Sequence, residues 1–127
     1  MNNSTQLLVG RVLLSILFIA AGLGKLAAPA GFAGYLQSLG FPAPTLMAWL
    51  TILLEVGGGL ALLAGFMTRY AAYALAAFCV ATAFLAHFNF ADQMQMTMFM
   101  KNVAIAGGLL VLATTGAGKF SVDAKRA

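Results

Sequence analysis

Apolar residues dominate four long runs of the sequence, which cover roughly residues 7–26, 45–65, 70–89 and 97–116. Short stretches that contain glycine, proline or charged residues separate these runs. A bilayer core of about 30 Å needs about 20 apolar residues in one helix, so each run is long enough to span it. The pattern predicts an all-α integral membrane protein in which four transmembrane helices form a bundle.

The connection between the first two runs carries a second helical pattern. Phe32, Tyr35, Leu36 and Leu39 recur at i, i+3, i+4 and i+7, and the pattern stops at Gly40. This spacing predicts a short amphipathic helix that lies in the membrane interface. We favour a structural lid or anchor over a substrate gate for this helix, because apolar stripes usually serve burial.

The composition agrees with a membrane protein and limits the number of domains. Of the 127 residues, 62% are hydrophobic and 8% are charged, and the mean hydropathy is +0.95. Four spans nearly exhaust the chain, so we expect a single domain over residues 1–127. We expect the first run to stay in the protein as a helix, because Arg11 lies inside it, whereas a signal peptide carries its charge ahead of the apolar run.

The distribution of lysine and arginine predicts the orientation in the membrane. One side of the bundle holds five of the seven basic residues, and the other side holds Lys25 and Lys101. Because basic residues favour the cytoplasmic side, we expect a multi-pass protein of a bacterial inner membrane with both termini cytoplasmic. The net charge of +4 is thus a topology signal, and it does not indicate a nucleic acid partner.

Glu55 is an isolated carboxylate in the apolar stretch LTILLEVGGGLALL. If its helix begins near residue 45, Glu55 lies about 15 Å from the helix start, close to the middle of the bilayer. A lone charge at that depth costs several kcal/mol, so the carboxylate is protonated, paired or next to a wet cavity. Side chains lean toward the N-terminus of their helix, which directs Arg11 away from Glu55.

Polar residues from all four predicted spans are expected between Glu55 and the outer surface. They form a candidate ligand-binding pocket open to the periplasmic side, which consists of Glu55, Lys101, Asn102, His87 and Lys25. An intramembrane acid is a functional candidate by default. The alternative is that the lysines and His87 extend to the lipid head groups while Glu55 is a neutral acid bonded to a backbone carbonyl. No catalytic residue is assigned.

Pairs of small residues four positions apart predict where helices approach closely. The pairs are Ala20–Gly24, Ala61–Gly65 and Ala104–Gly108. We expect these positions to lie at contacts between spanning helices. Self-association into a symmetric homo-oligomer stays open, because no feature of the sequence fixes the number of copies.

Metal and thiol chemistry have weaker support in the sequence. No metal site is predicted, although Met94, Met98 and His87 offer a weak alternative as a Cu(I) site. A single histidine supplies only one strong axial ligand for haem. Cys79 has no second cysteine with which to form a disulfide relay, so we expect a buried apolar side chain.

Several segments together resemble the DoxX family of small bacterial inner-membrane proteins. They are RVLLSILFIAAGLGKL, LLEVGGGLALLAGFMTRYAA, AHFNF and FMKNVAIAGGLLVLATTGAGKFSVD. The residues that stand in the order of the family pattern are Arg11, Lys25, Glu55, Arg69, His87, Lys101 and Asn102. The resemblance implies a link to redox chemistry. Related DoxD-type chains are membrane subunits of quinone-reducing thiosulfate oxidoreductases, and DoxX proteins are linked to membrane complexes with soluble oxidative-stress enzymes.

The sequence leaves three functions open. The first is a membrane subunit of a quinone-linked oxidoreductase, in which the candidate pocket binds a quinone and the chain is not an autonomous enzyme. The second is a non-catalytic anchor that recruits soluble oxidoreductases through its loops or its basic C-terminus. The third, and the least favoured, is a pathway for a small solute or ion.

Overall fold

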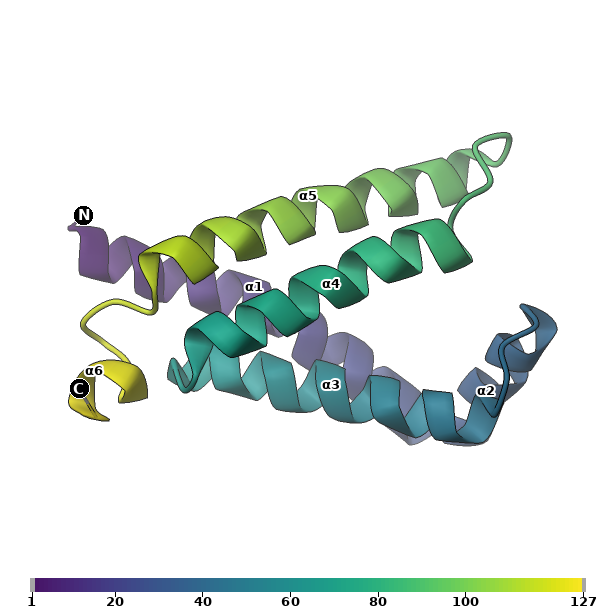
Figure 1. The fold of residues 1–127 in the computed structure, drawn as a ribbon, viewed down its shortest axis with the longest axis horizontal. Coiled ribbons are helices and arrows are strands. Elements are labelled where there is room, and N and C mark those ends of the chain that lie inside the picture. The colour runs from purple at the N-terminus through teal and green to yellow at the C-terminus, as the bar shows by residue number, and fades with distance from the viewer. Residues whose placement is uncertain (1, 127) are drawn as a thin grey trace.

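The computed structural model describes residues 2–126, and these residues form an all-α fold (Figure 1). The helices are α1 (Asn3–Ala27), α2 (Pro29–Ser38), α3 (Pro44–Ala64), α4 (Thr68–Ala86), α5 (Gln93–Thr115) and α6 (Val122–Arg126). Four of them, α1, α3, α4 and α5, are long and apolar enough to cross a membrane. The four predicted spans and the predicted helix in the first connection, α2, are therefore confirmed.

Local capping sets the ends of the long helices. The Asn2 side chain accepts a hydrogen bond from the Thr5 N–H at 2.8 Å and starts α1. Asp92 caps α5 in the same way by accepting from the Met94 N–H at 2.9 Å, so α5 begins at residue 93 and not at 97. α3 ends at Ala64, and Gly65 caps it with a φ of 71°, a left-handed conformation that glycine adopts without strain.

The long helices form two pairs that meet at one end of the molecule. α1 packs along α3, and α4 packs along α5. In Figure 1 the pairs diverge toward α2 and the α4–α5 turn, which we call the wide end, and they converge beside α6 at the narrow end. Side chains that are at most 2% exposed fill the space between the pairs, and among them are Leu62, Leu75 and Leu109. The narrow half is thus a packed core.

Two glycines allow α1 and α3 to approach closely. A Cβ added to Gly22 would lie 2.6 Å from Cγ2 of Val56, and one added to Gly59 would lie 2.8 Å from Cγ1 of Ile19. Only a residue without a side chain leaves room for the opposite backbone at these two positions. This contact joins the second half of α1 to the second half of α3 and places Glu55 directly against α1.

The small-residue pairs Ala20–Gly24 and Ala104–Gly108 are wrong as predictions of helix contacts. Gly24 and Gly108 are exposed, and a Cβ at either position would meet no neighbouring group within 4 Å. Gly65 is in close contact, but its neighbours are Arg11 and the segment before α6. Glycine is also frequent on the outer faces of membrane helices, so a four-residue spacing does not identify the packed face.

Arg11 joins α1 to the end of α3 and to the C-terminal segment. Its side chain is fully buried, and Nη1 donates to the carbonyls of Leu62 and Leu63 at 3.1 and 3.2 Å. Nη2 donates to the carbonyl of Phe120. The positive charge lies at the C-terminal end of α3, where the helix dipole favours a cation. Arg11 therefore points away from Glu55, as its direction on the helix predicts.

Asp123 of α6 closes the narrow end at the α3–α4 turn. Its carboxylate oxygens accept from the N–H groups of Met67 and Thr68 at 2.7 and 2.9 Å, and its own N–H donates to the Gly65 carbonyl at 2.8 Å. Burial raises the pKa of Asp123, but the hydrogen bonds from Thr68 and Met67 and the charge of Arg126 outweigh burial. The net pKa lies below its ordinary value. An ionised carboxylate thus caps the start of α4.

Candidate functional site

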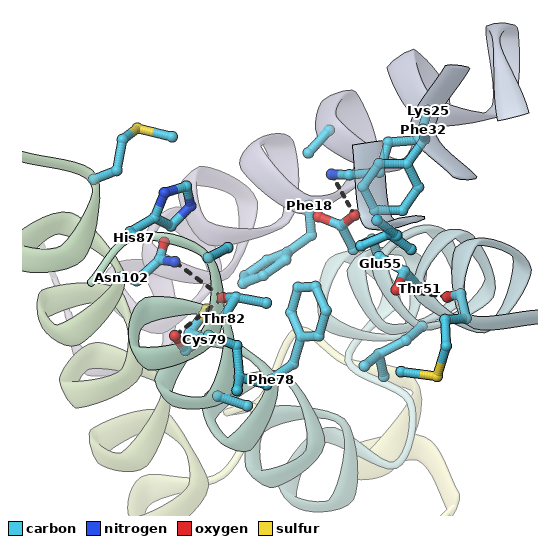
Figure 2. Close-up of a pocket in the computed structure, with 18 of the residues that line it drawn as sticks. Phe18, Lys25, Phe32, Thr51, Glu55, Phe78, Cys79, Thr82, His87 and Asn102 are labelled. Atoms are coloured by element: carbon cyan, nitrogen blue, oxygen red, sulfur yellow. Dashed lines mark hydrogen bonds and ion pairs between the residues drawn. The ribbon is translucent and has the colours of Figure 1, made fainter. Parts of the chain in front are cut away.

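A cavity of about 630 Å³ lies between the two helix pairs in the wide half of the molecule. All the residues of the candidate pocket line it, namely Glu55, Lys101, Asn102, His87 and Lys25. Figure 2 shows Glu55 and Lys25 on the wall made by α1 and α3, and Asn102 and His87 on the wall made by α4 and α5. The fold therefore brings together five polar residues that are spread over 78 positions of the sequence.

On the first wall, Glu55 forms an ion pair with Lys25. Oε1 of Glu55 lies 2.7 Å from Nζ of Lys25, and the two side chains are 5% and 26% exposed. The close approach at Gly22 causes this pairing, because Gly22 lies against Glu55 and Lys25 follows it by one turn of α1. The Phe32 ring of α2 lies 5.2 Å from Nζ of Lys25, a cation–π contact. The acid is buried, while its partner is partly open to the cavity.

On the opposite wall, a chain of hydrogen bonds orients Asn102. The Thr82 hydroxyl donates to the Cys79 carbonyl at 3.1 Å, so Thr82 Oγ1 accepts from Nδ2 of Asn102 at 3.0 Å (Figure 2). This direction fixes the side-chain amide of Asn102. Its carbonyl oxygen makes no hydrogen bond within residues 2–126 and is available to another donor.

His87 follows the last residue of α4 and is held by Gln95 on α5. Nδ1 of His87 lies 2.9 Å from Oε1 of Gln95. A hydrogen bond to the amide oxygen uses a proton on Nδ1, so Nε2 is the ring nitrogen left for a ligand. The imidazole is thus held through one nitrogen, while the other can exchange a proton with a ligand.

The space between the polar walls is lined mainly by apolar and aromatic side chains. Phe18 and Phe78 lie between the walls in Figure 2, and α2 and the loop after it add Tyr35 and Phe41. Cavities of about 300–1,000 Å³ with a few polar groups among apolar ones are typical of small-molecule sites. A flat, mostly apolar molecule with polar atoms on opposite edges fits this arrangement.

Sequence reasoning missed four residues of this site. Phe32, Thr82 and Cys79 line the cavity, and Gln95 holds His87. Cys79 is 3% exposed, which confirms the prediction of a buried side chain. Thr82 and Cys79 share a helix face because they are three positions apart, and that spacing was the available signal. Gln95 and His87 meet only because the α4–α5 turn folds back.

The residues of the weak copper alternative are only partly close to the cavity. Met98 and His87 line it, whereas Met94 is 68% exposed. Within residues 2–126 the structure contains no group of three or more His, Cys, Asp or Glu side chains placed to hold a metal ion. The Cu(I) site thus remains an alternative without support from this geometry.

Comparison with known proteins identifies the family. The sequence model of DoxX matches residues 6–88, which covers α1 to α4. The chain belongs to the DoxX family. It is an integral membrane protein of that family, and the matched segment includes Lys25, Glu55 and His87. Lys101 and Asn102 lie on α5, beyond the end of the match.

Two proteins of Escherichia coli K12 are similar to this DoxX-family chain over most of its length. The inner membrane protein YqjF is 52% identical over 116 residues, which are 91% of this chain and 88% of YqjF. The inner membrane protein YphA is 35% identical over 122 residues, which are 92% of this chain and 87% of YphA. Both similarities extend into α5. No solved structure matches the chain.

Proposed function

We propose that this DoxX-family protein is a membrane subunit of a quinone-linked redox system and that its cavity holds the quinone head group. The main support for this proposal is that polar residues stand on two opposite walls of a mostly apolar cavity. Glu55 and Lys25 stand on one side, and Asn102 and His87 stand on the other. A quinone ring is flat and has carbonyl oxygens, which accept hydrogen bonds, at opposite edges. The Lys25 ammonium can donate to one oxygen, and the second Nδ2 hydrogen of Asn102 can donate to the other.

The polar groups suit the protonation steps of quinone chemistry. Reduction of a quinone to a quinol consumes two electrons and two protons. We assign the electrons to a soluble oxidoreductase partner, and the protons to a doubly protonated His87 on one wall, which gives up its Nε2 proton, and to the Lys25 ammonium of the Lys25–Glu55 pair on the other. On this proposal the chain is a non-autonomous subunit: it binds and positions the quinone while its partner supplies the reducing power.

The membrane and the orientation are part of the same proposal. YqjF and YphA are named inner membrane proteins, and we assign this chain to the bacterial inner membrane. The excess of basic residues at the narrow end supports cytoplasmic termini and a cavity that opens toward the periplasm. The whole chain then forms one domain, whose wide end lies at the outer surface.

Quinone retention tests the proposal. The wild-type protein is purified in mild detergent and loaded with decylubiquinone, and native mass spectrometry counts the adduct. Glu55→Gln keeps the shape of the side chain but removes the charge that holds Lys25, so we expect at least about tenfold weaker binding. Asp92→Asn is the matched control: it is also an acid-to-amide change, but it lies outside the cavity, and asparagine caps a helix as well as aspartate does.

The outcomes separate the proposed functions. Loss of the adduct in Glu55→Gln, with retention in Asp92→Asn, supports the quinone site. Absence of the adduct from the wild-type protein, or equal binding by all three proteins, would overturn it. A protein that binds no quinone but still captures a soluble oxidoreductase in both variants would instead be an anchor.

A further inference from the structure

A second hollow lies at the narrow end, away from the quinone cavity. It is a shallow hollow with a volume of about 330 Å³, bordered by the end of α3 and the C-terminal segment. Its lining residues are Ala64, Lys119, Phe120, Ser121, Val122 and Lys125. Two lysines thus border one hollow at the narrow end, where the apolar helix α3 ends.

The lysines of this hollow, Lys119 and Lys125, make no ion pair with a carboxylate within residues 2–126. Asp123 lies between them in the sequence, but both of its oxygens bind the first N–H groups of α4. The Ser121 hydroxyl is also occupied, since it donates to Gly118 and accepts from Ala124. The hollow therefore presents two positive groups to whatever occupies it.

An apolar strip continues from the hollow along the outside of α3. Ala64 lines the hollow, and Leu60, Gly57 and Leu53 follow on the same helix face at spacings of four, three and four residues. Leu60 is 50% exposed and Leu53 is 70% exposed, and Gly57, which is exposed as well, lowers the surface between them. The surface is thus cationic at the hollow and apolar along the helix.

The hollow is also held in place by the bundle. The Phe120 carbonyl binds the buried guanidinium of Arg11, and the Asp123 N–H binds the carbonyl of Gly65. These contacts fix the segment that carries Lys119 to the ends of α1 and α3. A ligand at this position would meet a preorganised surface, which lowers the entropic cost of binding.

We propose that this hollow is a binding site for one anionic phospholipid. The phosphate group lies between Lys119 and Lys125, and an acyl chain runs along Leu60, Gly57 and Leu53. The distribution of charge supports this occupant, because a phospholipid combines an anionic head with an apolar tail in the same order. Basic pockets on the cytoplasmic side of membrane proteins bind such head groups, and each basic residue near the surface adds to the affinity.

Lipid binding to the delipidated full-length protein tests the site. Phosphatidylglycerol and phosphatidylcholine with the same acyl chains are titrated separately, and native mass spectrometry counts the first bound lipid. We expect phosphatidylglycerol to bind more tightly than phosphatidylcholine and to raise the unfolding temperature. In Lys119→Ala/Lys125→Ala the affinity for phosphatidylglycerol should fall by about tenfold or more.

Two further variants guard against a general effect of charge or folding. Arg69→Ala/Arg126→Ala removes the same two charges at the same end of the bundle but outside the hollow, and we expect it to keep the affinity for phosphatidylglycerol. Lys119→Arg/Lys125→Arg should keep it too, because arginine also binds phosphate. An equal loss in the Arg69/Arg126 variant would overturn the proposal in favour of diffuse attraction. Equal binding of phosphatidylcholine, or displacement of the lipid by millimolar inorganic phosphate, would also overturn it.

Discussion

The two ends of the bundle use charged side chains in different ways. At the narrow end, Arg11 and Asp123 direct their polar atoms to backbone groups of α3, α4 and the C-terminal segment. At the wide end, Glu55 pairs with Lys25, and both side chains border a cavity. A charge whose partners are all backbone groups stabilises the fold, whereas a charge beside a cavity can also serve a ligand.

This comparison predicts unequal costs for substitutions at the two ends. Changes at the narrow end should lower stability, because they leave backbone groups unpaired or displace a packed segment. Changes at the wide end should have small effects on stability and large effects on ligand binding.

Arg11→Met should cause the largest loss. The substitution keeps much of the apolar stem but removes the hydrogen bonds to Leu62, Leu63 and Phe120, at a cost of about 3 kcal/mol. Thermal unfolding in detergent, followed by circular dichroism, measures the change. Arg69→Met, at an exposed position on α4, is the control and should unfold like the wild type. If the two variants were equally stable, the hydrogen bonds of Arg11 to α3 and to the C-terminal segment would not stabilise the fold.

Gly65→Ala should cost about 2 kcal/mol. Gly65 has a φ of 71°, and an added Cβ would lie 2.5 Å from Nη1 of Arg11 and would also meet the Cβ of Ser121. Both the backbone and the C-terminal segment would have to shift. Gly24→Ala is the matched control, because Gly24 is helical and open, and we expect unchanged or slightly higher stability there. The same unfolding assay compares the two, and a neutral Gly65→Ala would contradict the packing described above.

Asp123 should make stability depend on pH. Its pKa is lower in the folded protein than in the unfolded chain, so its contribution is complete above the unfolded pKa of about 4 and disappears as pH falls through the folded pKa. Asp123→Asn keeps only one of the two acceptor oxygens that bind Met67 and Thr68, so it should lose about 1 kcal/mol at neutral pH and show a flatter stability profile between about pH 5 and pH 2. Unfolding temperatures across that range measure it. Parallel profiles for the two proteins would contradict the capping role.

Glu55→Gln should change stability least. Lys25 is 26% exposed and can turn toward the cavity when its partner is neutral, so we expect a loss of about 1 kcal/mol or less. Binding of decylubiquinone should fall in the same variant. A large loss of quinone binding beside a small loss of stability would show that the two ends of the bundle use charge differently. A loss of stability as large as that of Arg11→Met would make Glu55 a structural residue like those of the narrow end.

The structure agrees with the predictions from the sequence at some positions and not at others, and the reasons are physical. The spans and α2 follow from the spacing of apolar residues, which is a local property of the chain. The direction of Arg11 follows from the tilt of side chains along a helix. The partners of Asn102 and His87, which are Thr82 and Gln95, depend on how α4 and α5 pack, and no local pattern reports that. The same holds for Gly22 and Gly59, since the sequence does not say which small residues face the interior.

The sequence by itself determined that this chain has four membrane-spanning helices with one acid in their midst, because hydropathy and helix length act residue by residue. Only the tertiary structure decided that Glu55 pairs with Lys25, that the polar walls face each other across a cavity, and that residues 116–126 close the other end. Those features depend on distances between residues far apart in the chain. Such distances are set by close packing between helices, such as the contact of α1 with α3 at Gly22 and Gly59.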